Sequence, residues 1–116
     1  MLDAEVLVKL AAKSAAEKKA QDILILDVAN LLVITNYFLI CSGKTNRQVK
    51  TISQFIQEKL GEKKTKPIGR EGEDKGIWIL LDYGDVVIHV FTEQERNYYE
   101  LERLWRDAPQ FEWEEG

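Results

Sequence analysis

The sequence is poor in the residues on which disulfide-bonded, zinc-binding and membrane proteins depend. It contains one cysteine, Cys41, and one histidine, His89, among 116 residues. One cysteine excludes an internal disulfide and suits a reducing compartment, and a lone imidazole argues against a zinc site. No apolar run approaches the roughly 20 residues of a membrane span, and the N-terminus lacks the regions of a signal peptide. The sequence therefore predicts a soluble cytoplasmic protein that binds no membrane.

The composition is that of an ordinary globular domain. Hydrophobic residues make up 45% of the chain and charged residues 31%, which is typical of a folded protein and not of a disordered one. A chain of this length usually forms one domain. We expect that domain to span residues 1–108, and the tail at 109–116 to fray after Pro109.

The charges are unevenly distributed along the chain. Residues 44–70 carry eight Lys and Arg against two acids, a net +6, whereas residues 71–92 total −4 and residues 93–116 total −5. A solvated mixture of charges has the same composition and needs no partner. The alternative is that the C-terminal half prefers a basic partner and is repelled by bare nucleic acid.

Three segments have the signals of amphipathic helices. The first spans residues 3–19 and can be capped by Asp3; its apolar side holds Val6, Leu7, Leu10, Ala11 and Ala15. The second opens on the capping box of residues 45–48, and Gly61 can end it. The third opens on the capping box of residues 92–95 and ends before Pro109, with Tyr98, Leu101 and Trp105 on one face.

Four segments read as strands: residues 22–28, 37–41, 77–82 and 85–91. Alternation places Ile79 and Leu81 on the opposite face from Trp78, and Tyr83-Gly84 has the spacing of a two-residue hairpin loop. The glycine-rich residues 61–76 are expected to form a mobile connection. The strand–helix–strand unit from residue 37 to 82 favours a parallel crossover. The predicted class is α/β (α+β): a mixed sheet of about four or five strands with helices packed on it.

The sequence contains a partial likeness to nucleotidyltransferases. A Ser-Gly turn at 42–43 precedes a carboxylate-bearing strand, but those enzymes hold Mg²⁺ with carboxylates on alternate residues of one strand. Here Asp82 and Asp85 flank a turn, and Val87 and His89 follow where the next carboxylate should be. We therefore expect a related fold without the metal site, no catalytic residue and no cofactor.

One aromatic feature, the pair Tyr98-Tyr99, favours a binding surface. A helix cannot bury the adjacent Tyr98 and Tyr99 equally, so at least one should be exposed and surrounded by carboxylates. This composition is typical of an interface anchor. For His89 we favour a partly buried, hydrogen-bonded strand residue over a binding role, and Cys41 should be a small apolar residue at a strand end.

The motifs resemble those of the Iojap-type ribosomal silencing factors. The resemblance runs from about residue 3 to 106. It is carried in the first half by KAQDI, LDV and YFLICSG, and in the second by DYGDVVIHVF and YELERLW. The second set is highly specific.

This resemblance implies a cytoplasmic factor, commonly a homodimer, with a nucleotidyltransferase-like fold and no established catalysis. Such a factor docks on the large ribosomal subunit through ribosomal protein L-fourteen, blocks joining of the small subunit and represses translation. The expected contact residues are Trp78, Asp82, Asp85, His89, Glu95, Tyr99, Glu100 and Glu102. A nucleotidyltransferase-like enzyme remains an alternative, as does a ribosomal-RNA-binding module using residues 44–70, which could also make a peripheral RNA contact.

Overall fold

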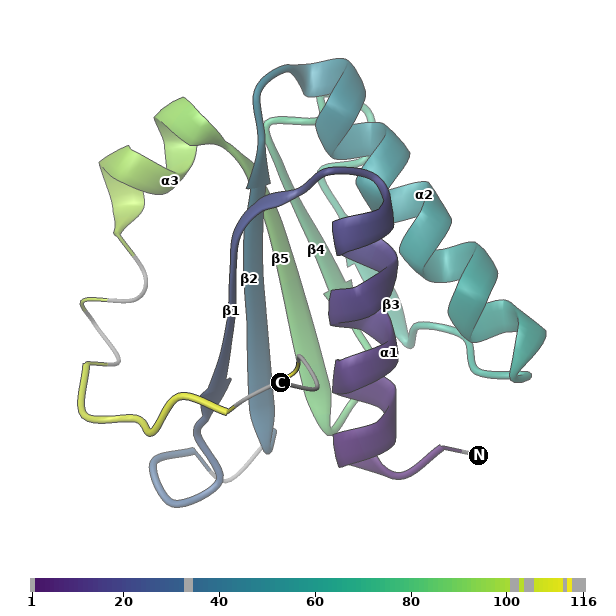
Figure 1. The fold of residues 1–116 in the computed structure, drawn as a ribbon, viewed down its shortest axis with the longest axis vertical. Helices are drawn as coiled ribbons and strands as arrows, with labels where there is room; N and C mark the ends of the chain where they lie inside the picture. The colour runs from purple at the N-terminus through teal and green to yellow at the C-terminus, as the bar shows by residue number, and fades with distance from the viewer. Residues whose placement is uncertain (1, 33–34, 101–102, 104–105, 112, 114–116) are drawn as a thin grey trace.

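The computed structural model describes residues 2–32, 35–100, 103, 106–111 and 113. In chain order these residues form α1 (Ala4–Glu17), β1 (Gln21–Asp27), β2 (Tyr37–Gly43), α2 (Asn46–Glu62), β3 (Gly69–Glu71), β4 (Trp78–Asp82), β5 (Val86–Thr92) and α3 (Glu93–Tyr99). The strands make one five-stranded mixed sheet in the order β1-β2-β5-β4-β3. Figure 1 shows α1 and α2 side by side on one face of the sheet, with α3 on the other side. The predicted α/β class is confirmed.

The parallel pairing within the sheet differs from the prediction. β2 pairs in parallel with β5, through Tyr37 opposite Val86, whereas β4 is antiparallel to β5. The prediction that residues 77–82 run parallel to residues 37–41 is therefore wrong. β5 lies beside β2, and β4, which forms an antiparallel hairpin with β5, runs antiparallel to both. The expected mobile connection also contains a strand, since β3 pairs with β4 through Arg70 opposite Leu81.

The hairpin loop lies one residue later than predicted. Asp82 pairs with Val87, and the Tyr83 N–H donates to the Val86 carbonyl at 2.9 Å, so the loop residues are Gly84 and Asp85. Gly84 has φ +85°, a conformation that glycine adopts without steric cost. Tyr83 is instead buried, with 8% of its surface exposed.

The main core lies between the sheet and the pair α1 and α2. The predicted alternation is confirmed, because Ile79 and Leu81 join this core while Trp78 packs on the opposite face. Cys41 is fully buried here as predicted. In α1 the buried side is rotated from the predicted one: Val8 and Ala12 are buried, whereas Val6 is 48% exposed.

The caps of α1 and α2 follow the sequence signals with two differences. The Asp3 carboxylate accepts the Val6 N–H, as predicted. The Thr45 hydroxyl accepts the Gln48 N–H at 3.1 Å, but the Gln48 amide oxygen accepts from Lys44 N–H rather than from Thr45. Gly61 lies inside α2, which ends one residue later at Glu62. Within the described residues, no helix combines the length and apolarity that a bilayer crossing requires.

The last helix is shorter than predicted. α3 ends at Tyr99 because Glu100 adopts a left-handed conformation with φ 49°, which stops helical propagation. Half of the predicted capping box is present, since the Thr92 hydroxyl accepts the Glu95 N–H at 3.3 Å, but the Thr92 N–H donates to the Ile77 carbonyl at 2.9 Å rather than to Glu95. The predicted helical positions Leu101 and Trp105 lie outside the described residues.

Residues 109–111 are held along β1 and do not fray. Asp27 N–H donates to the Pro109 carbonyl at 2.8 Å, and Phe111 N–H donates to the Ile25 carbonyl at 2.9 Å. The Phe111 ring lies 5.2 Å from the Tyr37 ring. The expected fraying is wrong for these residues because their backbone groups complete the outer edge of the sheet. Residues 112 and 114–116 lie outside the described part of the chain.

Candidate functional site

Aromatic side chains gather on the sheet face that α1 and α2 leave uncovered. The β4–β5 register places Trp78 opposite Phe91, and their ring centroids are 4.8 Å apart. Tyr99, on α3, also packs against Trp78, with ring centroids 4.9 Å apart, and the Tyr98 ring centroid lies 5.0 Å from that of Tyr99. We call this group, together with His89, the aromatic patch: Trp78, His89, Phe91, Tyr98 and Tyr99.

Trp78 and His89 are joined at the base of the patch. The Trp78 indole N–H donates to His89 Nδ1 at 3.1 Å. Because an indole nitrogen can only donate, Nδ1 must be unprotonated, and the imidazole is neutral with its proton on Nε2. Burial lowers the pKa of His89 from 6.5 to about 4, since a charged ring cannot be solvated there. The predicted hydrogen-bonded strand histidine is confirmed, although it is more deeply buried than expected, at 6% exposed.

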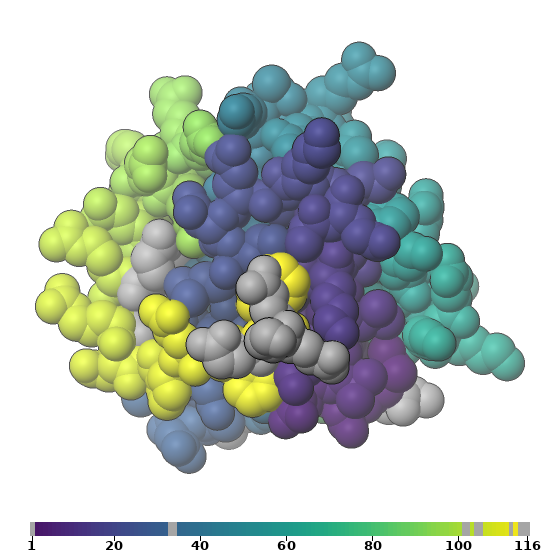
Figure 2. Space-filling view, in the orientation of Figure 1, coloured from purple at the N-terminus to yellow at the C-terminus, as the bar shows by residue number. Residues whose placement is uncertain are grey.

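The outer surface of the patch consists of the two tyrosines. Tyr98 is 78% exposed and Tyr99 44%, so the expectation that at least one would face solvent is confirmed. Sequence reasoning did not include Tyr98 among the contact residues, although the adjacency rule itself pointed to one of this pair. In Figure 2 the light-green surface of α3 lies at the left margin of the molecule, on the opposite side from the teal surface of α2.

Carboxylates border the aromatic patch along α3. Glu93 and Glu95 occupy the first turn, where they also favour the helix dipole. Glu100 is the C-cap, and its carboxylate accepts a hydrogen bond from the Arg103 guanidinium at 2.8 Å. The helix that carries the tyrosines therefore also carries carboxylates, of which Glu100 is paired with Arg103.

The predicted contact residues do not all lie together. Trp78, His89 and Tyr99 are in contact, with Glu95 and Glu100 on the same helix as Tyr99. Asp82 lies four residues from Trp78 along β4, or about 13 Å, at the far end of the strand. There its carboxylate accepts the Gly84 N–H at 2.8 Å, and Asp85 is exposed in the adjoining loop. Glu102 lies outside the described residues.

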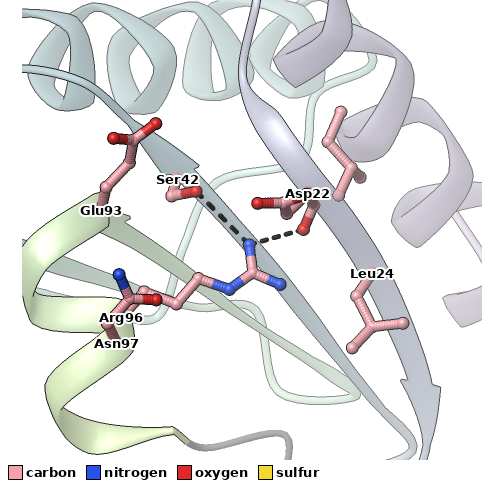
Figure 3. Close-up of a pocket in the computed structure, with 7 residues that line it drawn as sticks. Asp22, Leu24, Ser42, Glu93, Arg96 and Asn97 are labelled. Carbon is pink, nitrogen blue, oxygen red and sulfur yellow. Dashed lines mark hydrogen bonds between the residues drawn. The ribbon is translucent and has the colours of Figure 1, made fainter.

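Sequence reasoning missed Arg96, the buried side chain that fastens α3 to the sheet. The residue is 8% exposed, and Figure 3 shows its side chain extending from α3 toward β1 and β2. Its Nη1 donates to the Asp22 carbonyl at 2.5 Å, the Gln21 carbonyl at 3.4 Å and the Ser42 hydroxyl at 3.5 Å. The spacing of Arg96 from Thr92 and Tyr99 places the three residues on one helix face. This spacing could have indicated that Arg96 faces the sheet.

A cavity of about 410 Å³ adjoins this arginine. It is lined by Asp22, Ile23, Leu24, Ser42, Glu93, Arg96 and Asn97. The ionisable residues in this lining are two acids, Asp22 and Glu93, and one base, Arg96. A charged ligand would therefore contact groups of both signs. In the part of the chain that the structure describes, no three His, Cys, Asp or Glu side chains come close enough to hold a metal ion.

The fold and the aromatic patch define a small α/β protein that presents an acidic aromatic surface beside a mixed sheet. The chain belongs to the ribosomal silencing factor family: the family model described as "Ribosomal silencing factor during starvation" matches residues 2–116. The resemblance drawn from the motifs is thereby confirmed. Membership supports a ribosome-associated role in regulating translation, and the family's name describes regulation rather than a catalysed reaction.

Known relatives cover most of the chain. The chain is 44% identical to the ribosomal silencing factor of Bacillus subtilis over 103 residues, which are 89% of this chain and 87% of that protein. It is 30% identical to a mouse protein named "Mitochondrial assembly of ribosomal large subunit protein 1", over 77% of this chain and 40% of that protein. A crystal structure of a Chromobacterium violaceum protein, 34% identical, superposes with a TM-score of 0.88 over 99% of this chain and 95% of that one.

Proposed function

We propose that this protein binds the large ribosomal subunit through ribosomal protein L-fourteen, sterically blocks joining of the small subunit and so represses translation in the cytoplasm. It does so by binding alone, without catalysis or a cofactor. The observation that carries the proposal is the aromatic patch with its border of carboxylates. The name of the mouse relative, which refers to the large ribosomal subunit, supports the choice of subunit.

The composition of the patch suits an interface anchor. Tyrosine and tryptophan dominate the energetics of protein interfaces, because each buries a large rigid area at little cost in conformational entropy. Tyr99 is half exposed and rests on Trp78, so a partner that covers Tyr99 also completes the burial of the indole ring. His89 lies behind Trp78 and contributes by holding the indole N–H.

The charge of this region favours a basic protein partner. Residues 71–116 carry thirteen acids against four Lys and Arg, and opposite charges across an interface speed association and exclude partners of like charge. Glu95 and Glu100 are the acids nearest the tyrosines on α3. Binding through them should weaken as salt is added, because exposed charges are screened.

The test is subunit-association light scattering with and without the purified protein, combined with sedimentation of large subunits. Tyr99→Ala should weaken binding by about 2 kcal/mol, or about thirtyfold, and should restore subunit joining to the same extent. Trp78→Ala and Glu100→Lys are expected to act in the same direction. Val6→Ala is a matched control, because Val6 is 48% exposed and belongs to α1, on the other side of the sheet from α3. Full binding by folded Tyr99→Ala and Trp78→Ala would refute the placement.

The acids at the β4–β5 loop require a separate test. Asp85 is exposed and can be replaced without removing a described side-chain hydrogen bond, whereas Asp82 caps the loop. If both ends of β4 face the partner, Asp85→Lys should weaken subunit binding in addition to the effect of Tyr99→Ala. Unchanged binding by Asp85→Lys would confine the docking surface to the aromatic patch.

A peripheral contact with ribosomal RNA is the second candidate, favoured by the basic surface along α2. Lys44 and Arg47 are exposed at the start of α2, and Lys63, Lys64 and Lys66 are exposed after its end. Binding to isolated ribosomal RNA that falls steeply with salt would support it. Calorimetry with ATP and Mg²⁺ tests the nucleotidyltransferase alternative, and sedimentation equilibrium tests the homodimer that the family resemblance implies.

A further inference from the structure

Among the residues that the structure describes, hydrophobic packing does not explain the position of α3. The helix has seven residues, Glu93–Tyr99, and the one buried side chain among them is that of Arg96. Helices of this length are unstable in isolation, because nucleation costs more than a few hydrogen bonds return. Most short helices are held by an apolar face, but α3 contributes only the half-exposed Tyr99 to such contact.

A local irregularity of β1 supplies the acceptors for Arg96. The β1–β2 register shifts between Gln21 and Leu24, and Asp22 has φ 50°, which non-glycine residues rarely adopt. Within this bulge the carbonyls of Gln21 and Asp22 accept from the guanidinium. The Ser42 hydroxyl donates to the Gln21 carbonyl at 3.2 Å, so β1 and β2 hold the acceptors together.

We infer that Arg96 is the positioning residue of the docking surface: it fastens α3 to the β1 bulge and so sets where Tyr98 and Tyr99 stand relative to Trp78. The inference rests on the proposed function for the meaning of that surface. Arg96 and Tyr99 are three residues apart and share a helix face. A rotation of α3 that released the guanidinium would also lift Tyr99 from the Trp78 ring.

Arginine suits this position better than lysine. All three described hydrogen bonds come from Nη1, and a guanidinium is more weakly hydrated than a lysine ammonium, so it is easier to bury. A buried cation without its acceptors would draw α3 toward water. Asp22 accepts from Arg96 through its backbone carbonyl, so we expect the fastening to depend on the backbone conformation of Asp22 rather than on the identity of its side chain.

This distinction provides a matched pair of variants at one exposed position. Asp22→Gly permits φ 50° and keeps both carbonyls in place. Asp22→Val disfavours that φ, because a β-branched side chain is strained there. Hydrogen exchange of the Glu95 and Glu100 amides, with the β5 amides as reference, should be close to wild type in Asp22→Gly and faster by about tenfold or more in Asp22→Val. Equal exchange in the two variants would overturn the role of the bulge.

Arg96 itself is tested by replacement with Met and Lys. Arg96→Met should raise α3 exchange by about tenfold or more while β5 stays protected, and should weaken large-subunit binding by a similar factor. Arg96→Lys should lie between it and wild type. Lys13→Met is the control, because it removes one exposed positive charge from α1. Unchanged α3 exchange in Arg96→Met would overturn the inference.

The same experiment separates this inference from the proposed function. If Arg96→Met loosens α3 but binds large subunits normally, the fastening is real and its role in docking is refuted. If the wild-type protein binds no large subunit, the proposed function falls, and α3 exchange still decides whether Arg96 fixes the helix. A loss of binding together with loosened α3 and an intact β5 supports both.

Discussion

Acid should destabilise this protein through its only histidine. His89 is neutral in the folded state, where its Nδ1 accepts the Trp78 indole N–H and burial lowers its pKa from 6.5 to about 4. Between these two pH values the unfolded chain binds more protons than the folded one, so stability rises with pH. The contribution of His89 is complete above about pH 6.5, is lost as the pH falls toward 4, and changes no further below that.

The size of the effect follows from the two pKa values. A pKa difference of one unit corresponds to about 1.4 kcal/mol, so the full effect is about 3 kcal/mol. Between pH 7 and about pH 4.5 the expected loss is about 2 kcal/mol, because most of the unfolded population is protonated over that interval while the folded state is not. This is a large fraction of the stability of a small domain.

The comparison uses His89→Asn, whose side-chain oxygen can replace Nδ1 as the acceptor for Trp78 but does not titrate. Urea unfolding of both proteins is followed from pH 7 to about pH 4.5. The difference in unfolding free energy should change by about 2 kcal/mol in favour of the variant as the pH falls. A constant difference across this range would refute the reasoning. So would an NMR titration of the folded protein that gives His89 a pKa near 6.5.

Three further outcomes follow from single positions. Gly72→Ala should lower the unfolding free energy by about 2 kcal/mol or more in denaturant titration, because Gly72 has φ +82° and an added Cβ would lie 2.0 Å from the Trp78 carbonyl oxygen; Gly69→Ala, where nothing lies within 4 Å, is its control. Cys41 should resist thiol reagents until the protein unfolds, because burial raises its pKa to about 12; rapid modification of the folded protein would contradict this. Phe111→Ala should speed amide exchange at Asp27 while β5 stays protected, and equal exchange would show that the tail is held by its backbone alone.

Much of the candidate site was accessible from local pattern. Trp78 and Tyr99 were expected on one surface and are in contact, because strand alternation and helix adjacency both act over a few residues. Asp82 and Asp85 were expected beside them, yet they lie at the other end of β4. Asp82 and Asp85 share their negative charge with the glutamates of α3, but a common charge does not predict that residues lie close together in the fold.

The sequence by itself indicated the N-cap residues of the three helices, the two faces of the central hairpin and every described element except β3, because hydrophobic period and capping depend on neighbouring residues. Only the tertiary structure decided that β5 lies beside β2, that α3 stops at Glu100, and that residues 109–111 follow β1. The burial of Arg96 belongs to this second group. Its acceptors at Gln21 and Asp22 lie 75 and 74 residues earlier in the chain, and a cation is buried only where folding brings such oxygens around it.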